Sequence, residues 1–161
     1  MTTTIKRLNH AVLWVSDVGR SASFYQRVLG FQEVERMGDA ACFMRGSGSE
    51  NHHDLAVMRA AAPGQARAGA TGLYHLAWQV GSIDELAEAA VLLAQEGSLV
   101  GMSDHGVSKS LYAKDPDGIE FELMWEVPRE DWGDAAQHGV VRPLDLRREL
   151  ARYGAAATSA D

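Results

Sequence analysis

Hydrophobic and polar residues alternate along short segments of this chain in the manner of β-strands. Residues 5–15 (IKRLNHAVLWV) are rich in β-branched and aromatic types and predict a first strand. In SASFYQRVLG (21–30) apolar residues recur at helical spacing, and Gly30 supplies a stop. The three short strands expected next have the sequences FQEVERM, AACFMR and HHDLAVMRA. The first 60 residues therefore predict the order βαβββ.

The same order restarts after a segment of small residues at 61–71. GLYHLAWQV (72–80) predicts a strand, and 84–96 predicts an amphipathic helix that ends at Gly97. The strands expected after it are SLVGM, SKSLYAKD and IEFELMWEV. The two opening strands match in detail, because NHAVLWV and YHLAWQV each place a histidine early in an apolar strand. An internal repeat of this kind indicates a duplicated structural unit.

The repeat predicts an α+β fold of two tandem βαβββ modules that form one cupped mixed sheet around a metal cleft. Within a single domain, module 1 spans about residues 5–60, the linker 61–71 and module 2 about 72–127. The C-terminal tail, 128–161, carries PREDWGD, which predicts a short helix or turn. The tail continues with RPLDLRRELARYG, which predicts a helix that covers a sheet edge or a partner subunit.

Composition narrows the class of protein. A net charge of -7 argues against nucleic-acid binding, which normally uses a basic face. No apolar run approaches the roughly 20 residues that span a bilayer, and the first residues do not resemble a signal peptide. The lone cysteine, Cys42, excludes an internal disulfide and suits the cytoplasm; its place in a buried strand predicts an inert thiol.

Strand alternation points to a set of candidate metal ligands. Side chains two residues apart share a face, so His10 lies with Val12 and Trp14 in the first strand. His75 takes the equivalent place in the fifth strand, and Glu122 lies in the last strand. If the helices cover the other faces, His10, His75 and Glu122 converge in the cleft. Two histidines and one carboxylate leave coordination positions open and suit Fe(II), with Mn(II) as an alternative ion.

Two other carboxylates compete with this set. Glu120 shares a face with Glu122, and we interpret it as an edge or solvent-facing residue. Asp54 lies on the fourth predicted strand next to His53. Because neighbouring side chains on a strand point to opposite faces, only one of His53 and Asp54 should face the cleft.

These segments resemble the vicinal oxygen chelate superfamily, which includes glyoxalases, antibiotic-resistance binding proteins and extradiol dioxygenases. The resemblance covers nearly the whole chain up to about residue 127 and rests on NHAVLWVSD, YHLAWQV and DPDGIEFEL. The stretch from His105 through Tyr112 to Glu122 is also similar to the signature of type I extradiol ring-cleavage dioxygenases. The chain departs from that signature at Ser103, two residues before the histidine.

The resemblance implies a non-haem Fe(2+) enzyme, with Mn(2+) as the alternative, that cleaves the ring of a catechol-type aromatic diol with O2. It implies that the three ligands named above bind the metal. His53 would act as an acid–base group, while His105 and Tyr112 would hydrogen-bond the substrate oxygens.

Two other functions stay open within the same superfamily. A glyoxalase-like metal-dependent lyase or isomerase usually takes a fourth ligand, most often a glutamate, from the fourth strand. A non-catalytic resistance protein that binds an aromatic drug usually lacks the metal ligands. Larger extradiol relatives carry an additional pair of modules, and we expect a homodimer here.

Overall fold

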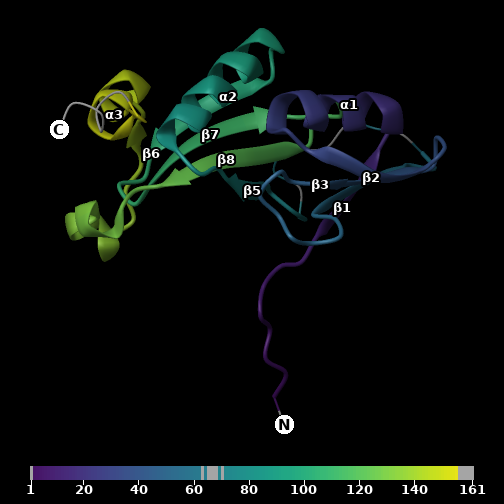
Figure 1. Ribbon diagram of the computed structural model, residues 1–161, viewed down its shortest axis with the longest axis horizontal. Coiled ribbons are helices and arrows are strands. Elements are labelled where there is room, and N and C mark those ends of the chain that lie inside the picture. Colours follow the sequence, from purple (N-terminus) through teal and green to yellow (C-terminus); the bar gives the residue numbers. More distant parts are fainter. Residues whose placement is uncertain (1, 63, 65–68, 70, 156–161) are drawn as a thin grey trace. The chain divides into compact units, whose positions relative to one another are not determined.

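The computed structural model describes residues 2–62, 64, 69 and 71–155 and contains two compact units, Met1–Ala66 and Arg67–Asp161 (Figure 1). Six residues of the predicted linker 61–71 lie outside the described residues. In each unit, a strand and a helix precede three further strands, and each unit forms its own mixed sheet. The predicted α+β fold of tandem βαβββ modules is therefore confirmed. One joined sheet around a cleft stays a prediction.

Unit 1 is a four-stranded sheet with one helix on its face (Figure 1). The strand order is β1-β4-β3-β2, with β1 parallel to β4 and the other neighbours antiparallel. The elements are β1 (Ala11–Val15), α1 (Val18–Leu29), β2 (Gln32–Met37), β3 (Ala41–Arg45) and β4 (Leu55–Arg59).

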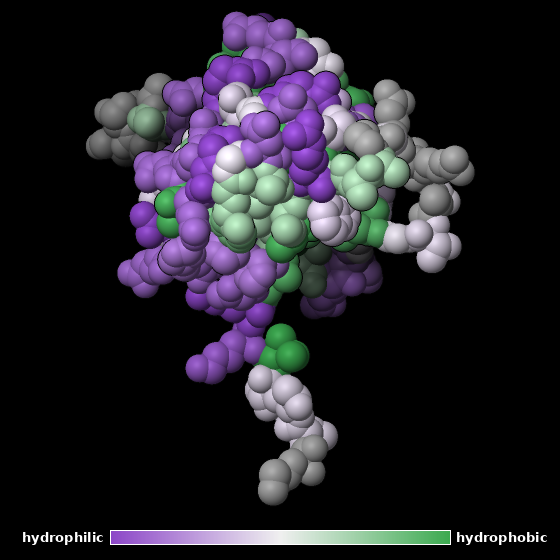
Figure 2. All heavy atoms as spheres, turned by 90° about the vertical axis from the view of Figure 1, so that its right-hand side faces the viewer, coloured by the Kyte–Doolittle hydropathy of each residue, from purple (hydrophilic) through white to green (hydrophobic). Residues whose placement is uncertain are grey.

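The core of unit 1 lies between α1 and the sheet. Asp17 caps the helix by accepting a hydrogen bond from the Arg20 N–H, and Gly30 ends it at a φ of 66°. On β1, Leu13 is buried, whereas Val12 and Trp14 are exposed. The alternation predicted for this strand is therefore present, with Trp14 on the face opposite to the core. The side of the molecule that carries β2 is mainly hydrophilic, and all six residues of β2 are exposed (Figure 2).

Unit 2 repeats this arrangement and adds a fifth strand. The strand order is β5-β8-β7-β6-β9, with β5 parallel to β8. The helix α2 packs on one face of this sheet, where Phe121, Leu123 and Trp125 of β8 are buried. The elements are β5 (Leu76–Gln79), α2 (Ile83–Gln95), β6 (Leu99–Asp104), β7 (Ser108–Lys114), β8 (Glu120–Glu126), β9 (Arg142–Pro143) and α3 (Leu146–Tyr153).

The C-terminal tail completes unit 2. The short helix or turn predicted in PREDWGD is present as two 3-10 turns, Arg129–Asp131 and Gly133–Ala136. The predicted second helix is shorter than expected, because its first residues pair with the edge of β6 as β9. The helix α3 begins only after Asp145, which caps it, and packs beside α2. Residues 156–161 lie outside the described part of the chain.

Three predicted strands begin later than their sequences suggested. The strand predicted at 5–15 starts at Ala11, and its first partner on β4 is Leu55. Upstream of Leu55 the chain folds into a loop, so the residues before Ala11 have no strand to pair with. The fourth and fifth strands likewise start at Leu55 and Leu76. His10, His53 and His75 therefore lie immediately before strands or in loops, and not within the strands as predicted.

Among the described residues, no helix is long and apolar enough to cross a membrane.

Candidate metal and active site

Unit 2 brings His75 and Glu122 together. His75 directly precedes β5 and Glu122 lies on β8, which is parallel to β5, with Ala77 of β5 opposite Glu122. His75 Nε2 lies 3.0 Å from Glu122 Oε2, and both side chains are largely shielded from solvent. The other ring nitrogen of His75, Nδ1, is buried and has no hydrogen-bond partner among the described residues. The pair therefore presents one nitrogen and one carboxylate oxygen toward each other.

The turn before β8 sets the position of Glu122. Asp115 Oδ1 accepts hydrogen bonds from the backbone N–H groups of Asp117, at 2.9 Å, and Ile119, at 2.8 Å. Gly118 has a φ of 80°, a conformation that favours glycine. The Asp-Pro-x-Gly part of the motif is thus a structural turn that ends at Gly118, and β8 begins two residues later, at Glu120.

Tyr112 and His105 lie beside this pair. Tyr112 of β7 is directly opposite Glu122 on β8, and its ring centroid lies 5.7 Å from that of His75. The Tyr112 hydroxyl lies 2.9 Å from His105 Nε2. Burial, and then the charge of Glu122, raise the pKa of the Tyr112 hydroxyl. The phenol is therefore protonated at neutral pH and able to donate a hydrogen bond.

A backbone carbonyl fixes the proton on His105. His105 Nδ1 lies 2.9 Å from the Val140 carbonyl oxygen, which only accepts hydrogen bonds. Nδ1 must therefore carry a proton, so in the neutral ring Nε2 is the acceptor. The Tyr112 hydroxyl consequently donates to His105 Nε2.

In unit 1, a pair of asparagines supports His10. His10 is exposed, and its Nδ1 lies 2.9 Å from Asn9 Oδ1, an acceptor, so Nδ1 carries the proton and Nε2 keeps its lone pair. Asn51 donates to the Asn9 carbonyl at 3.0 Å and to Asp54 Oδ1 at 2.6 Å. The contact with Asn9 uses only Nδ1, so His10 Nε2 remains available to bind a metal.

His53 lies next to His10, with their ring centroids 4.6 Å apart. It also contacts the ring of Phe43, at 5.3 Å, and its Nδ1 lies 3.1 Å from that of His52. Burial, followed by the neighbouring charges of His10 and His52, lowers the pKa of His53 below its ordinary value of 6.5. His53 is therefore neutral at pH 7 and can accept a proton.

The rival carboxylates have other partners. Asp54 accepts hydrogen bonds from the Gly46 N–H and the Ser49 hydroxyl, in addition to Asn51. Burial raises the pKa of Asp54, but these hydrogen bonds outweigh it and lower the pKa. Asp54 thus organises the loop before β4. A hydrogen bond to Glu120 raises the pKa of Tyr74, whose ring lies tilted against that of His75 with ring centroids 4.5 Å apart.

Cys42 is fully buried, and burial raises the pKa of its thiol to about 11. A buried, protonated thiol is a poor nucleophile.

The donor atoms of unit 2 fit a divalent ion. Two ligands about 2.1 Å from one ion, at a right angle, stand about 3.0 Å apart, which is the separation of His75 Nε2 and Glu122 Oε2. No three His, Cys, Asp or Glu side chains gather into a metal-binding cluster anywhere in the described residues. The third predicted ligand, His10, belongs to unit 1.

Comparison with known proteins identifies the family. The model of the Glyoxalase/Bleomycin resistance protein/Dioxygenase superfamily matches residues 7–123. The chain belongs to this superfamily, which confirms the resemblance inferred from its motifs.

Two curated relatives are aromatic-ring dioxygenases by name. Catechol-2,3-dioxygenase of Bacillus subtilis is 33% identical over 125 residues, which cover 78% of this chain and 43% of the relative. The manganese-dependent 2,3-dihydroxybiphenyl 1,2-dioxygenase of Geobacillus genomosp. 3 is 28% identical over 134 residues, covering 80% of this chain and 39% of the relative. The chain thus spans less than half the length of these two proteins.

Solved structures agree on the fold. A fosfomycin resistance protein from Listeria monocytogenes superposes with a TM-score of 0.61 at 21% identity, covering 80% of this chain and 99% of that protein. The fold alone therefore does not identify the activity of this chain.

Several residues of the site were not predicted from sequence. Asn9 and Tyr74 each directly precede a predicted histidine, so their positions alone could have flagged them. Asn51 lies in a loop, and Val140 contributes only its backbone carbonyl. Neither of these two has a side-chain signature that a sequence pattern would reveal.

Proposed function

We propose that this protein is a non-haem Fe(II)-dependent extradiol dioxygenase that cleaves the ring of a catechol-type substrate with O2. The observation that carries the proposal is the pairing of His75 with Glu122 beside the hydrogen-bonded Tyr112 and His105. His105, Tyr112 and Glu122 stand at positions of the extradiol signature, and His75 lies in the superfamily segment YHLAWQV. The names of the curated relatives, which act on catechol and biphenyl diols, support the same reaction.

In this proposal His10, His75 and Glu122 hold the metal. The bound ion would supply coordination positions for both vicinal oxygens of the diol and for O2. We propose Fe(II) as the bound ion, and the name of the manganese-dependent relative supports Mn(II) as the alternative.

The chain's own residues then bind substrate and move protons. Tyr112 lies opposite Glu122 and is suited to hydrogen-bond a substrate oxygen, with its orientation fixed by His105. His53, neutral at pH 7, takes the proton from a substrate hydroxyl and later returns it to the reacting oxygen. Trp14, exposed on the face opposite to the core of unit 1, is a candidate to contact the aromatic ring.

The hydrogen bonds in the loop before β4 argue against the alternative function of a glyoxalase-like lyase or isomerase. Such an enzyme usually takes a fourth ligand, most often a glutamate, from the fourth strand. Asp54 is the carboxylate directly before β4, and both of its oxygens accept hydrogen bonds within the loop. Three ligands without a fourth match a metal that must also bind O2.

We further propose a cytoplasmic homodimer. The exposed strand β2 at the edge of the unit 1 sheet offers a surface on which a second copy could associate. A single, buried cysteine suits a reducing compartment.

The test is anaerobic reconstitution with Fe(II), followed by oxygen and a panel of catechols. We expect oxygen uptake and a yellow ring-cleavage product, both lost in His10→Ala and Glu122→Ala. His138→Ala, an exposed histidine of the tail, is the matched control and should keep the activity. A folded, iron-loaded protein that gives no product with any catechol would overturn the proposal.

A further inference from the structure

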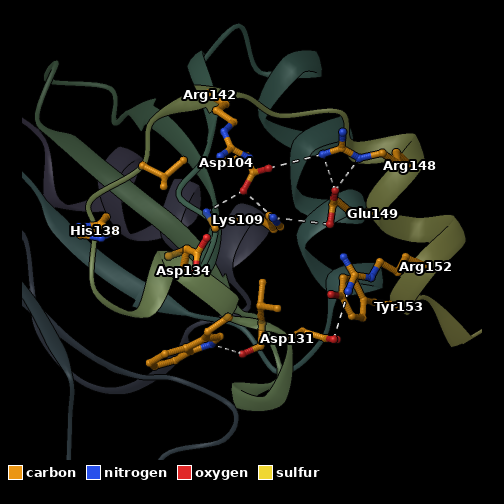
Figure 3. Close-up of a pocket in the computed structure, with 15 residues that line it drawn as sticks. Asp104, Lys109, Asp131, Asp134, His138, Arg142, Arg148, Glu149, Arg152 and Tyr153 are labelled. Carbon is orange, nitrogen blue, oxygen red and sulfur yellow. Dashed lines mark hydrogen bonds and ion pairs between the residues drawn. The ribbon is translucent and has the colours of Figure 1, made fainter.

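The C-terminal tail lines a charged pocket that lies next to His105. The pocket has a volume of about 700 Å³ and lies between the ends of β6 and β7, the two 3-10 turns and α3 (Figure 3). Gly106 and Val140, which flank His105 in space, form part of its wall. The residues around this pocket therefore also surround the histidine that orients Tyr112.

Buried charges anchor the tail to the sheet. Lys109 is 5% exposed and donates to Asp104, and its Nζ lies 3.6 Å from Glu149 of α3 (Figure 3). Arg148 bridges the two acids, at 3.5 Å from Asp104 and 2.8 Å from Glu149. Burying three charges is unfavourable unless all are paired, so α3 must stay docked for the cluster to be satisfied.

Two contacts link the anchored tail to His105. The strand β9 pairs Arg142 with Asp104, and Val140, two residues before Arg142, accepts the hydrogen bond from His105 Nδ1. On the other side, Ala135 of the second 3-10 turn packs against Gly106. A Cβ atom at position 106 would come within 2.4 Å of the Ala135 Cβ.

We propose that the tail is a positioning element that selects the tautomer of His105 and thereby the hydrogen-bond polarity of Tyr112. With Nδ1–H held by Val140, Nε2 accepts the Tyr112 proton, and the Tyr112 oxygen offers its lone pair to the substrate. The site then favours a diol that presents a protonated hydroxyl to Tyr112. In the other tautomer, Nε2–H would donate to Tyr112, and the freed phenol proton would favour a substrate oxyanion.

This inference rests on the proposed function only in assigning the ligand of Tyr112 as a diol. The tautomer itself can be measured without any activity. Nitrogen-15 NMR of the metal-free, ¹⁵N-histidine-labelled full chain distinguishes a protonated from an unprotonated ring nitrogen. His105→Gln assigns the signals. In the wild type we expect the neutral His105 ring to carry its proton on Nδ1 and to leave Nε2 unprotonated.

A pair of variants isolates the contact with the tail. Gly106→Ala pushes the new methyl group against Ala135, and at a φ of 76° it also strains the backbone. Gly106→Ala/Ala135→Gly keeps the strain but removes the clash, since the next atoms lie at 3.9 Å. We expect the single variant to lose the dominant Nδ1–H form and the double variant to regain it.

A second pair of variants tests the anchor. Glu149→Gln weakens the ion pairs of α3, whereas Arg147→Gln removes an exposed charge from the same helix. Only Glu149→Gln should increase the fraction of Nε2–H. If catechols are cleaved, KM should rise in parallel with that fraction, with a smaller effect on kcat.

The outcomes separate the two proposals. An Nε2–H tautomer in the wild type, or a Gly106→Ala variant whose tautomer is unchanged, would overturn the positioning role. Failure of the double variant to restore Nδ1–H would do the same. Absence of ring cleavage together with the expected tautomer changes would overturn the dioxygenase assignment and leave this inference intact.

Discussion

Asn9 illustrates how one residue can decide which atom of a histidine is available. Its side-chain oxygen holds the proton on His10 Nδ1, at 2.9 Å, and leaves Nε2 as the lone-pair donor. Partners of this kind typically change metal affinity by roughly 10–100-fold when they are removed. We therefore expect Asn9→Ala to weaken Fe(II) or Mn(II) binding by about tenfold in anaerobic titration.

The control for Asn9→Ala is His138→Ala, which removes an exposed imidazole of the tail and should leave the affinity unchanged. Equal affinities of the wild type and Asn9→Ala would show that His10 needs no such orientation, or that it is not a ligand.

At the residue scale, sequence patterns predicted side chains better than they predicted the groups that orient them. Alternation and the internal repeat selected His75 and Glu122, which the structure places 3.0 Å apart. The partner of His105 is a backbone carbonyl contributed by Val140, 35 positions further along the chain. Every residue except proline carries the same donor and acceptor, so only the folded chain identifies which carbonyl is used.

At the scale of elements, the start of a strand depends on its neighbour. The apolar pattern of 5–15 continues upstream of Ala11, but β4 begins at Leu55 and offers no partner before it. Asp54, directly before β4, accepts hydrogen bonds from the loop that precedes this strand. The order of the elements follows from local pattern, whereas their ends follow from pairing and loop hydrogen bonds that a single segment does not encode.

The buried cluster that joins β6, β7 and α3 predicts an acid-sensitive element. Burial raises the pKa of Asp104, but hydrogen bonds from Lys109 and the Gly106 N–H, with the charges of Lys109 and Arg148, outweigh it and lower the pKa below 3.8. A carboxyl whose pKa is lower in the folded state stabilises the fold above its unfolded pKa. That contribution is lost as pH falls from about 3.8 through the folded pKa.

Asp104→Asn should therefore lower the free energy of unfolding at pH 7 by roughly 1.5–3 kcal/mol, as expected for a hydrogen bond to a charged group. The difference from the wild type should shrink below pH 4, when measured by urea denaturation across pH. Asp39→Asn is the matched control, because the Asp39 side chain is 95% exposed. A deficit that stays constant from pH 7 to pH 3 would contradict this role of the Asp104 charge.

At the scale of the whole molecule, the chain couples a duplicated architecture to residues that differ between its copies. Both units share the βαβββ order and a histidine directly before or beside the opening strand. Only unit 2 adds a ninth strand, a third helix and the ordered pair of Tyr112 and His105. Duplication thus accounts for the βαβββ order that both units share. The C-terminal tail supplies β9 and α3, which distinguish unit 2 from unit 1.

Metal binding should reveal whether both copies contribute ligands. A ligand that binds only the folded state at 100 times its dissociation constant adds about 2.7 kcal/mol of stability. If His10, His75 and Glu122 all bind the ion, the added protection extends to strands of both units. An ion held by His75 and Glu122 alone would protect only unit 2. We therefore expect hydrogen exchange with saturating Mn(II) to slow in β1 and β4 as well as in β5 and β8.

His10→Ala should abolish the metal-dependent protection of β1 and β4 and reduce that of β5 and β8 through weaker binding. His138→Ala should behave as the wild type. Protection that stays confined to residues 71–155 in the wild type would remove His10 from the ligand set. The His75–Glu122 pair would then need its third ligand from elsewhere, and a second copy of the chain in the proposed dimer becomes the source to test.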